Sequence, residues 1–259
     1  MEEKECTIED CDIFDFMARH VGMTVIHPGG LRATHRLAEA LQIDKDTKVV
    51  DIACGKGTTA VYLAQKYDCQ VVGVDISEDL ITEAEALKKR KALEGKVTFR
   101  VGDALDMPFS DNEFDVAVSQ AMLILVSDKK KAIKEALRVT KSGGRAGWLE
   151  LSWKKQPTKE FIDAVSNVLC AYCMLKVHTF EEWDKLFKEA GVKQLEMMAS
   201  SMEFGGLGGM LGDEGFSNAF KIMFRFLTKG RIRKRMSTMN KFFRENGEYF
   251  GFWIYIGKK

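Results

Sequence analysis

The chain has 259 residues, of which 46% are hydrophobic and 30% are charged, and its formal net charge is +1. This length and composition favour one large globular domain with a sizeable core. The near-neutral charge excludes the broad basic field typical of nucleic-acid-binding proteins. No stretch approaches the roughly 18 uncharged apolar residues of a membrane span, so none is expected.

The opening residues, MEEKECTIEDCDIF, are acidic and polar, unlike a signal or transit peptide. The six cysteines are scattered, and without such a leader they are interpreted as reduced thiols. We therefore expect a cytoplasmic protein. Their spacing, with one C-x-x-C and no second pair, predicts no metal site.

Strands and helices are predicted to alternate along most of the chain. Apolar residues recur at helical spacing over 31–42. Short apolar runs then predict strands at 48–54, 70–77, 96–103, 114–120 and 145–153. Further helices are predicted at 58–67, 78–93, 128–140 and 179–191. Ser77 and Thr179 are expected as N-caps, and Gly143 with Gly144 is expected to close the helix over 128–140.

This alternation predicts an α/β fold, with right-handed βαβ units and helices on both faces of a parallel sheet. The predicted organisation is an N-terminal cap with entry helices (1–44), a core (45–153), an insertion (154–178), a core helix and strand (179–204), a helical cap insertion (205–248) and a final core strand (249–259). Insertions at the carboxyl edge of such a sheet usually cover the ligand crevice.

The stretch DIACGKGTTA carries Gly55, Gly57 and Ala60 in the spacing G-x-G-x-x-A, directly after the first predicted strand. This turn suits a dinucleotide or another adenosine ligand, and alone it does not distinguish them. Asp51 before the turn suits a cationic group and would repel a pyrophosphate. Asp75, at the end of the second strand, can accept from ribose hydroxyls, and Asp103 can accept from an adenine amino group.

Five motifs, in order, resemble those of the class I S-adenosylmethionine (SAM)-dependent methyltransferases, in the branch related to quinone-biosynthesis enzymes (methyltransferase type 11-like). They are VVDIACGKG, VVGVDIS, VTFRVGDALDMPF, FDVAVSQAML and ALRVTKSGGRAG. The resemblance covers about residues 45–152 and the final strand. It implies a single-domain enzyme with a seven-stranded Rossmann-like sheet, an antiparallel last strand and helical cap insertions.

The resemblance also implies which residues bind the SAM cofactor. Those expected around its methionine part are Asp51, Ala53, Gly55 and Gly57. Asp75 would hold the ribose, Ile76 would lie on the adenine, Asp103 and Ala104 would hold the adenine edge, and Gln120 would lie by the methyl donor. The sequence departs from the family at Cys54, where glycine is more usual.

The segment HPGGLRAT precedes the first core helix, where related enzymes close over the methionine carboxylate and the acceptor. Gly29 and Gly30 expose amides there, and Thr34 can donate to a carboxylate. His27 is the candidate general base, although methyl transfer from a sulfonium mainly needs in-line positioning.

The acceptor is expected to be an apolar or amphipathic small molecule, because the cap segments are rich in Met and Phe. One alternative is an arsenite or thiol methyltransferase that uses Cys170 and Cys173. Others are a SAM-binding protein without catalysis and an NAD-dependent oxidoreductase.

Residues 216–243 combine phenylalanines at helical spacing with a basic run, KGRIRKR. This pattern is typical of a lid helix or of a helix that lies on a membrane surface. Nucleic acid is not an expected partner, and the sequence favours no particular oligomeric state.

Overall fold

The computed structural model describes residues 12–169, 176–201 and 207–259. Its strands are β1 (Lys48–Ile52), β2 (Gln70–Asp75), β3 (Val97–Val101), β4 (Phe114–Gln120), β5 (Thr140–Trp153), β6 (His178–Thr179), β7 (Lys193–Ser201) and β8 (Phe250–Lys258). Its helices are α1 (Ile13–Asp15), the π-helix η1 (Phe16–Val21), α2 (Gly30–Ala40), α3 (Thr58–Tyr67), α4 (Glu78–Arg90), α5 (Lys129–Val139), α6 (Lys159–Leu169), α7 (Phe180–Ala190), α8 (Leu207–Thr228) and α9 (Gly230–Glu245).

The strands form one sheet in the order β3-β2-β1-β4-β5-β8-β7, and the short β6 pairs with β5. Strands β1 to β5 are parallel to their neighbours in this group. Strand β8 is antiparallel to both β5 and β7. The predicted α/β sheet with an antiparallel last strand is therefore confirmed, and the two-residue β6 is added to its seven strands.

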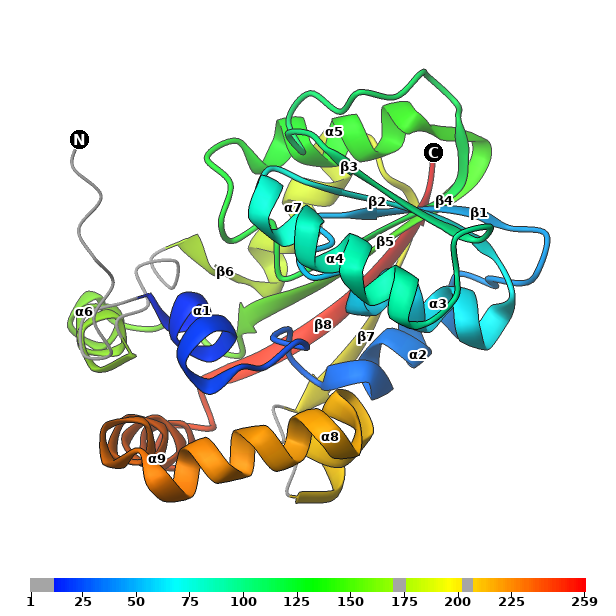
Figure 1. Ribbon diagram of the computed structural model, residues 1–259. Coiled ribbons are helices and arrows are strands. Elements are labelled where there is room, and N and C mark those ends of the chain that lie inside the picture. Colours follow the sequence, from blue (N-terminus) through cyan, green and yellow to red (C-terminus); the bar gives the residue numbers. More distant parts are fainter. Residues whose placement is uncertain (1–11, 170–175, 202–206) are drawn as a thin grey trace.

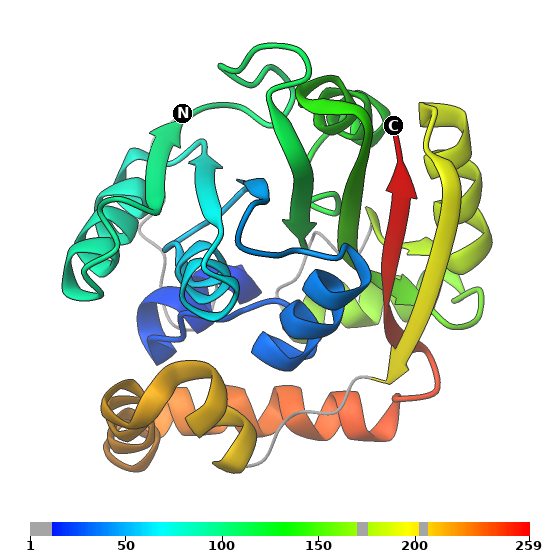
Figure 2. The ribbon, with the colours of Figure 1, turned by 90° about the vertical axis from the view of Figure 1, so that its right-hand side faces the viewer.

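Helices cover both faces of the sheet (Figures 1 and 2). Apolar residues of α2, α3 and α4 pack with one face in one buried cluster, whereas those of α5 and α7 pack in a second cluster on the other face. This burial provides the main stabilisation of the fold. The expected caps form: the Ser77 hydroxyl accepts from the Leu80 amide, and Thr179 and Glu182 make a capping box.

Helix α5 ends earlier than expected. It stops at Val139, and Thr140 already has extended backbone geometry and pairs with Phe114 of β4. The prediction that Gly143 and Gly144 close the helix is wrong, because both residues lie inside β5. Gly143 has a φ of +77° there, within the stretch where the register between β4 and β5 shifts.

The described part of the segment between β7 and β8 forms α8 and α9, and α8 is kinked at Gly215, where φ is +69° and ψ is 164°. Lys229 has extended backbone geometry and separates α8 from α9, so the predicted helical stretch over 216–243 is interrupted. Both views show α8 and α9 beside each other along the lower side of the molecule (Figures 1 and 2). Among the described residues, no helix is long and apolar enough to cross a membrane.

Candidate functional site

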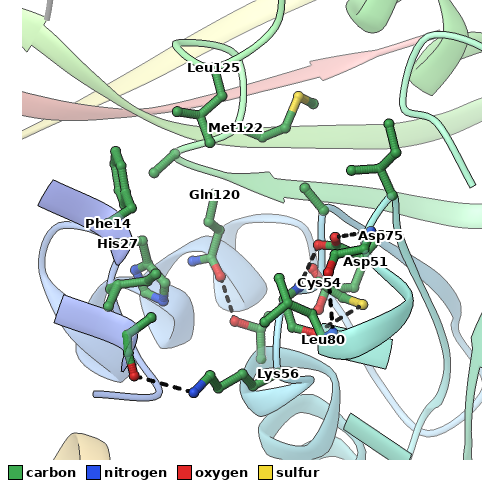
Figure 3. A pocket seen from close by; sticks show the side chains of 18 of the residues that line it. Phe14, His27, Asp51, Cys54, Lys56, Asp75, Leu80, Gln120, Met122 and Leu125 are labelled. Atoms are coloured by element: carbon green, nitrogen blue, oxygen red, sulfur yellow. Dashed lines mark hydrogen bonds between the residues drawn. The ribbon is translucent and has the colours of Figure 1, made fainter. Parts of the chain in front are cut away.

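A cavity of about 990 Å³ opens where β1, β2 and β4 end. This is the edge at which open parallel sheets bind ligands. Figure 3 shows that side chains from these strand ends face the N-terminal segment, which supplies Phe14 and His27 to the opposite wall. Nine of the residues expected at the cofactor site or as the base line this cavity: His27, Asp51, Ala53, Gly55, Asp75, Ile76, Asp103, Ala104 and Gln120.

The turn after β1 is held by the carboxylate that ends β2. Asp75 accepts hydrogen bonds from the Gly55 amide at 2.9 Å and from the Ser77 amide at 3.0 Å. Gly55 has a φ of +53°, and the space where a side chain would begin is open. Gly57 differs, because a Cβ there would lie 2.5 Å from the Phe99 ring. Gly57 therefore serves the packing of α3 against β3 and does not line the cavity.

Asp51 is a buried carboxyl group that faces the cavity, with only 3% of the residue exposed. Burial, and then the nearby Asp75 carboxylate, raise the pKa of Asp51 to about 8. Within the described part of the chain, Asp51 Oδ2 has no hydrogen-bond partner. An unpartnered carboxyl oxygen beside a second carboxylate fits a cationic ligand group, such as the ammonium of SAM, and disfavours a pyrophosphate.

A chain of hydrogen bonds connects the strand side of the cavity to the opposite side, the N-terminal wall, which is lined by residues between Phe14 and His27. The Thr59 hydroxyl donates to Gln120 Oε1 at 2.7 Å, and Gln120 Nε2 donates to Thr34 Oγ1 at 3.0 Å. Thr34 Oγ1 then lies 3.3 Å from His27 Nε2, and His27 Nδ1 lies 3.3 Å from the Pro28 carbonyl oxygen. Every contact is satisfied when His27 is neutral, with its proton on Nδ1. Burial lowers the pKa of His27 to about 4, which favours that neutral form.

The expected anion site at the start of α2 is already filled by the protein. An Asp213 carboxylate oxygen accepts from the Leu31 amide at 2.8 Å, and this carboxylate covers Gly30. Gly29 packs against the Phe252 ring. Gly29, Gly30 and Thr34 are thus absent from the cavity lining, and Thr34 reaches the site only through Gln120 and His27.

Glu214 fixes the N-terminal wall from the same segment of α8. Its carboxylate accepts from the Thr24 amide and hydroxyl, both at 2.8 Å, and from the Val25 amide at 3.2 Å. Asn218 donates to both Glu214 and the Gly22 carbonyl. Because Thr24 and Val25 line the cavity, these hydrogen bonds connect α8 to that wall. Sequence reasoning missed this contact, since an Asp-Glu pair in a glycine-rich segment shows no periodic signal.

The end of the cavity near β3 is more open. Ile76 is 70% exposed, and the Asp103 carboxylate accepts from the Leu105 amide at 2.9 Å. Cys54 is buried, and burial raises the pKa of its thiol well above the usual range. Leu80 and Leu105 supply the apolar surface there.

The loop after β4 supplies an apolar wall that the sequence interpretation did not single out: Met122, Leu125 and Val126 line the cavity. The loop rests on Glu150 of β5, whose Oε1 accepts from the Met122 amide at 3.2 Å and the Leu123 amide at 3.0 Å. Glu150 is fully buried, and burial raises its pKa to about 8. The apolar run AMLILV was the available signal for this wall.

The remaining expectations concern cysteine and metal chemistry. Cys170 and Cys173 lie outside the described residues. Among the residues that are described, no group of three or more His, Cys, Asp and Glu side chains is placed to hold a metal ion.

Comparison with known proteins identifies the family. The family model described as "Methyltransferase domain" matches residues 43–191. An uncharacterized protein of Haemophilus influenzae is 30% identical over 89% of this chain and 91% of its own length. Ajmaline N-methyltransferase of Rauvolfia serpentina is 42% identical over 38% of this chain, and the match covers 34% of that enzyme's length.

A solved structure shares the fold. The SAM-dependent methyltransferase of Geobacter sulfurreducens in complex with S-adenosylhomocysteine has a TM-score of 0.70 and 19% identity, with 96% of this chain and 98% of that chain covered. The family match, the cavity at the strand ends and the carboxylates that line it agree with one another. The chain belongs to the methyltransferase-domain family and is a class I SAM-dependent methyltransferase.

Proposed function

We propose that the enzyme transfers the methyl group of SAM to a small-molecule acceptor with an apolar or amphipathic body. The observation that carries this proposal is the division of the cavity into two sides. The carboxyl groups of Asp51 and Asp75 lie on one side, whereas Phe14, Met122 and Leu125 provide the apolar surface on the other (Figure 3). The charged groups of the cofactor would contact the carboxyl groups on one side, and the apolar acceptor would pack against the apolar side chains on the other.

The cofactor side is assigned as follows. Asp75 accepts from the ribose hydroxyls, and Asp51 pairs with the ammonium group. The open turn at Gly55 admits the methionine part. Ile76 and Leu80 lie against the adenine, while Asp103 and the Ala104 backbone hold its edge. SAM supplies an activated methyl group, so the protein needs no metal or nucleophile of its own to start the transfer.

Positioning is then the main task of the protein's side chains. Gln120 lies between the two sides of the cavity, and Thr59 and Thr34 hold its amide group in one orientation. A fixed amide at this place orients donor and acceptor in line, which lowers the entropy lost in the reaction. The N-terminal wall excludes water from the transfer.

His27 is proposed as the group that accepts a proton from acceptors that must lose one. Its Nε2 becomes available when Thr34 turns its hydroxyl away, and its low pKa makes it a weak base. This suits acceptors that need little base assistance. The relative named as an ajmaline N-methyltransferase supports a small-molecule acceptor, because its name describes N-methylation of the small molecule ajmaline.

The cofactor site is tested by thermal-shift titration of the wild-type protein and two variants with S-adenosylhomocysteine and NADH. We expect stabilisation by S-adenosylhomocysteine only. Asp75→Ala should weaken that binding by about a hundredfold, because two charge-assisted ribose contacts are lost and the Gly55 turn is released. Glu78→Ala, in the exposed first turn of α4, is the matched control and should bind normally. Equal binding by Asp75→Ala would refute the assignment, and stabilisation by NADH alone would revive the oxidoreductase alternative.

The acceptor class is tested by a screen of apolar amines, quinols, thiols and arsenite. Cys170→Ser should leave methylation of an organic acceptor unchanged. A large loss of rate on thiols or arsenite in that variant would support the thiolate alternative. Binding of SAM without turnover of any acceptor would support the non-catalytic alternative.

A further inference from the structure

Helix α8 presents an apolar stripe to solvent. Phe216 is 80% exposed, Phe220 65%, Phe224 58% and Leu227 61%. Their spacing of four, four and three residues places all four on one side of the helix. Single exposed apolar residues are ordinary, but a contiguous row of three phenylalanines and a leucine marks an interaction surface.

The opposite side of α8 is attached to the body of the enzyme. Ala219 and Ile222 are buried, with exposures of 2% and 3%. Asn218 and Arg225 donate hydrogen bonds to the Gly22 and Val21 carbonyls, each at 3.0 Å. The phenylalanine stripe is therefore held facing outward, on the part of α8 that follows the kink at Gly215, whereas the Glu214 contact to the cavity wall lies just before that kink.

Positive charge predominates from Gly215 to Arg244 of α9, although Asp213 and Glu214 precede this stretch and Glu245 follows it. Residues 215–244 contain nine lysines and arginines and no aspartate or glutamate, although the whole chain has a net charge of only +1. Lys221 of α8, Lys229 between the helices and Lys234 of α9 are exposed. The surface thus combines an exposed apolar stripe with a local excess of positive charge. A second copy of the chain would bring two such cationic regions together, which disfavours self-association through this face.

We propose that α8 and the start of α9 form a peripheral docking surface for an anionic phospholipid bilayer. The phenylalanines would enter the interfacial region, while the lysines and arginines meet lipid headgroups. The helices lie along one side of the molecule in both views, so they can rest on a membrane plane without crossing it (Figures 1 and 2).

The test is sedimentation of the full chain with vesicles of phosphatidylcholine alone or of phosphatidylcholine mixed with an equal amount of phosphatidylglycerol. We expect binding to the anionic vesicles only, and weaker binding at high salt. The triple variant Phe216→Ser, Phe220→Ser, Phe224→Ser should bind at least tenfold more weakly, because each side chain contributes apolar burial in the bilayer. Its melting temperature should stay close to the wild-type value, since these side chains are exposed.

A second variant removes charge without removing the stripe. Lys221→Gln, Lys229→Gln, Lys234→Gln should lower binding to anionic vesicles on the order of a hundredfold, at about fivefold for each basic residue. The matched control, Lys89→Gln, Lys91→Gln, Lys193→Gln, loses the same charge from exposed positions of other elements and should bind like the wild type.

Three results would overturn the proposal. One is equal binding of the wild type and both α8–α9 variants to anionic vesicles. Another is no vesicle binding together with a dimer, seen by light scattering, that the phenylalanine variant abolishes, because this would assign the stripe to a second copy. Capture of an acidic protein with no vesicle binding would likewise assign it to a protein partner.

Discussion

Replacing Glu214 with alanine tests whether α8 holds the N-terminal wall of the cavity in place. The change removes the acceptor of three hydrogen bonds from the wall, donated by the Thr24 amide, the Thr24 hydroxyl and the Val25 amide, and of one from Asn218 within α8. A hydrogen bond to a charged group contributes about 1.5–3 kcal/mol, and partial exposure of this carboxylate favours the lower end. We expect the wall to lose about 2–4 kcal/mol of local stability, a factor of about 30 to several hundred in its opening equilibrium.

Amide hydrogen exchange of residues 23–31 in the ligand-free protein measures this loss directly. Protection of the Thr24 and Val25 amides should fall by that factor, and the apparent affinity for S-adenosylhomocysteine should fall with it. Glu245→Gln removes an exposed carboxylate that pairs with Lys241 on α9, away from the wall, and it should leave exchange of the wall unchanged. Protection that stays within about threefold of wild type in Glu214→Ala would show that other contacts hold the wall.

Two further predictions follow from the buried titratable groups. At pH 7 the ligand-free enzyme keeps Asp51 mostly protonated, because its pKa is about 8, so binding of the cofactor's ammonium should release close to one proton per site. Calorimetry in buffers of different ionisation enthalpy should detect this proton. The variant Asp51→Asn should abolish the proton release, weaken cofactor binding and stabilise the free protein at neutral pH. Proton release that is unchanged in the variant would refute the assignment. The folded-state pKa of His27 is about 4, below its ordinary value of 6.5, so the unfolded state binds the additional proton and stability should fall as the pH drops from about 6.5 to 4. Denaturant unfolding at several pH values should show that His27→Gln lacks this component, which is at most about 3 kcal/mol; an identical pH dependence in the variant would contradict the reasoning.

The parallel core was predictable because its local signals agree. The buried strands contain short apolar runs, such as the paired valines of β1 and β2, and the helices between them have capping residues such as Ser77 and Thr179. The helix over 128–140 was misjudged at its end, because the glycine pair suggested a cap. The hydroxyl of Thr140 instead donates to the Ala136 carbonyl, and the backbone extends at once into β5.

The cofactor side of the site could also be predicted from the sequence, because Asp51, Asp75 and Asp103 lie at or within two residues of the carboxyl ends of β1, β2 and β3. The N-terminal wall was not. Its form depends on Asp213 and Glu214, which meet residues 24–31 from far along the chain and leave no local pattern. Gly29 and Gly30 were predicted to donate amide hydrogen bonds to a ligand. In the structure the Asp213 carboxylate covers Gly30, and Gly29 packs against the Phe252 ring.

The position of β8 constrains the order in which the molecule can form. This strand separates β5 from β7, so β7 has no neighbour in the sheet until residues 250–258 have left the ribosome. During synthesis, the five parallel strands can assemble first and leave the edge of β5 open. The later pairing joins segments far apart in the chain, which slows folding and exposes unpaired strand edges while it is incomplete. Completion of the sheet is therefore expected to be a late step of folding, after the parallel strands have assembled.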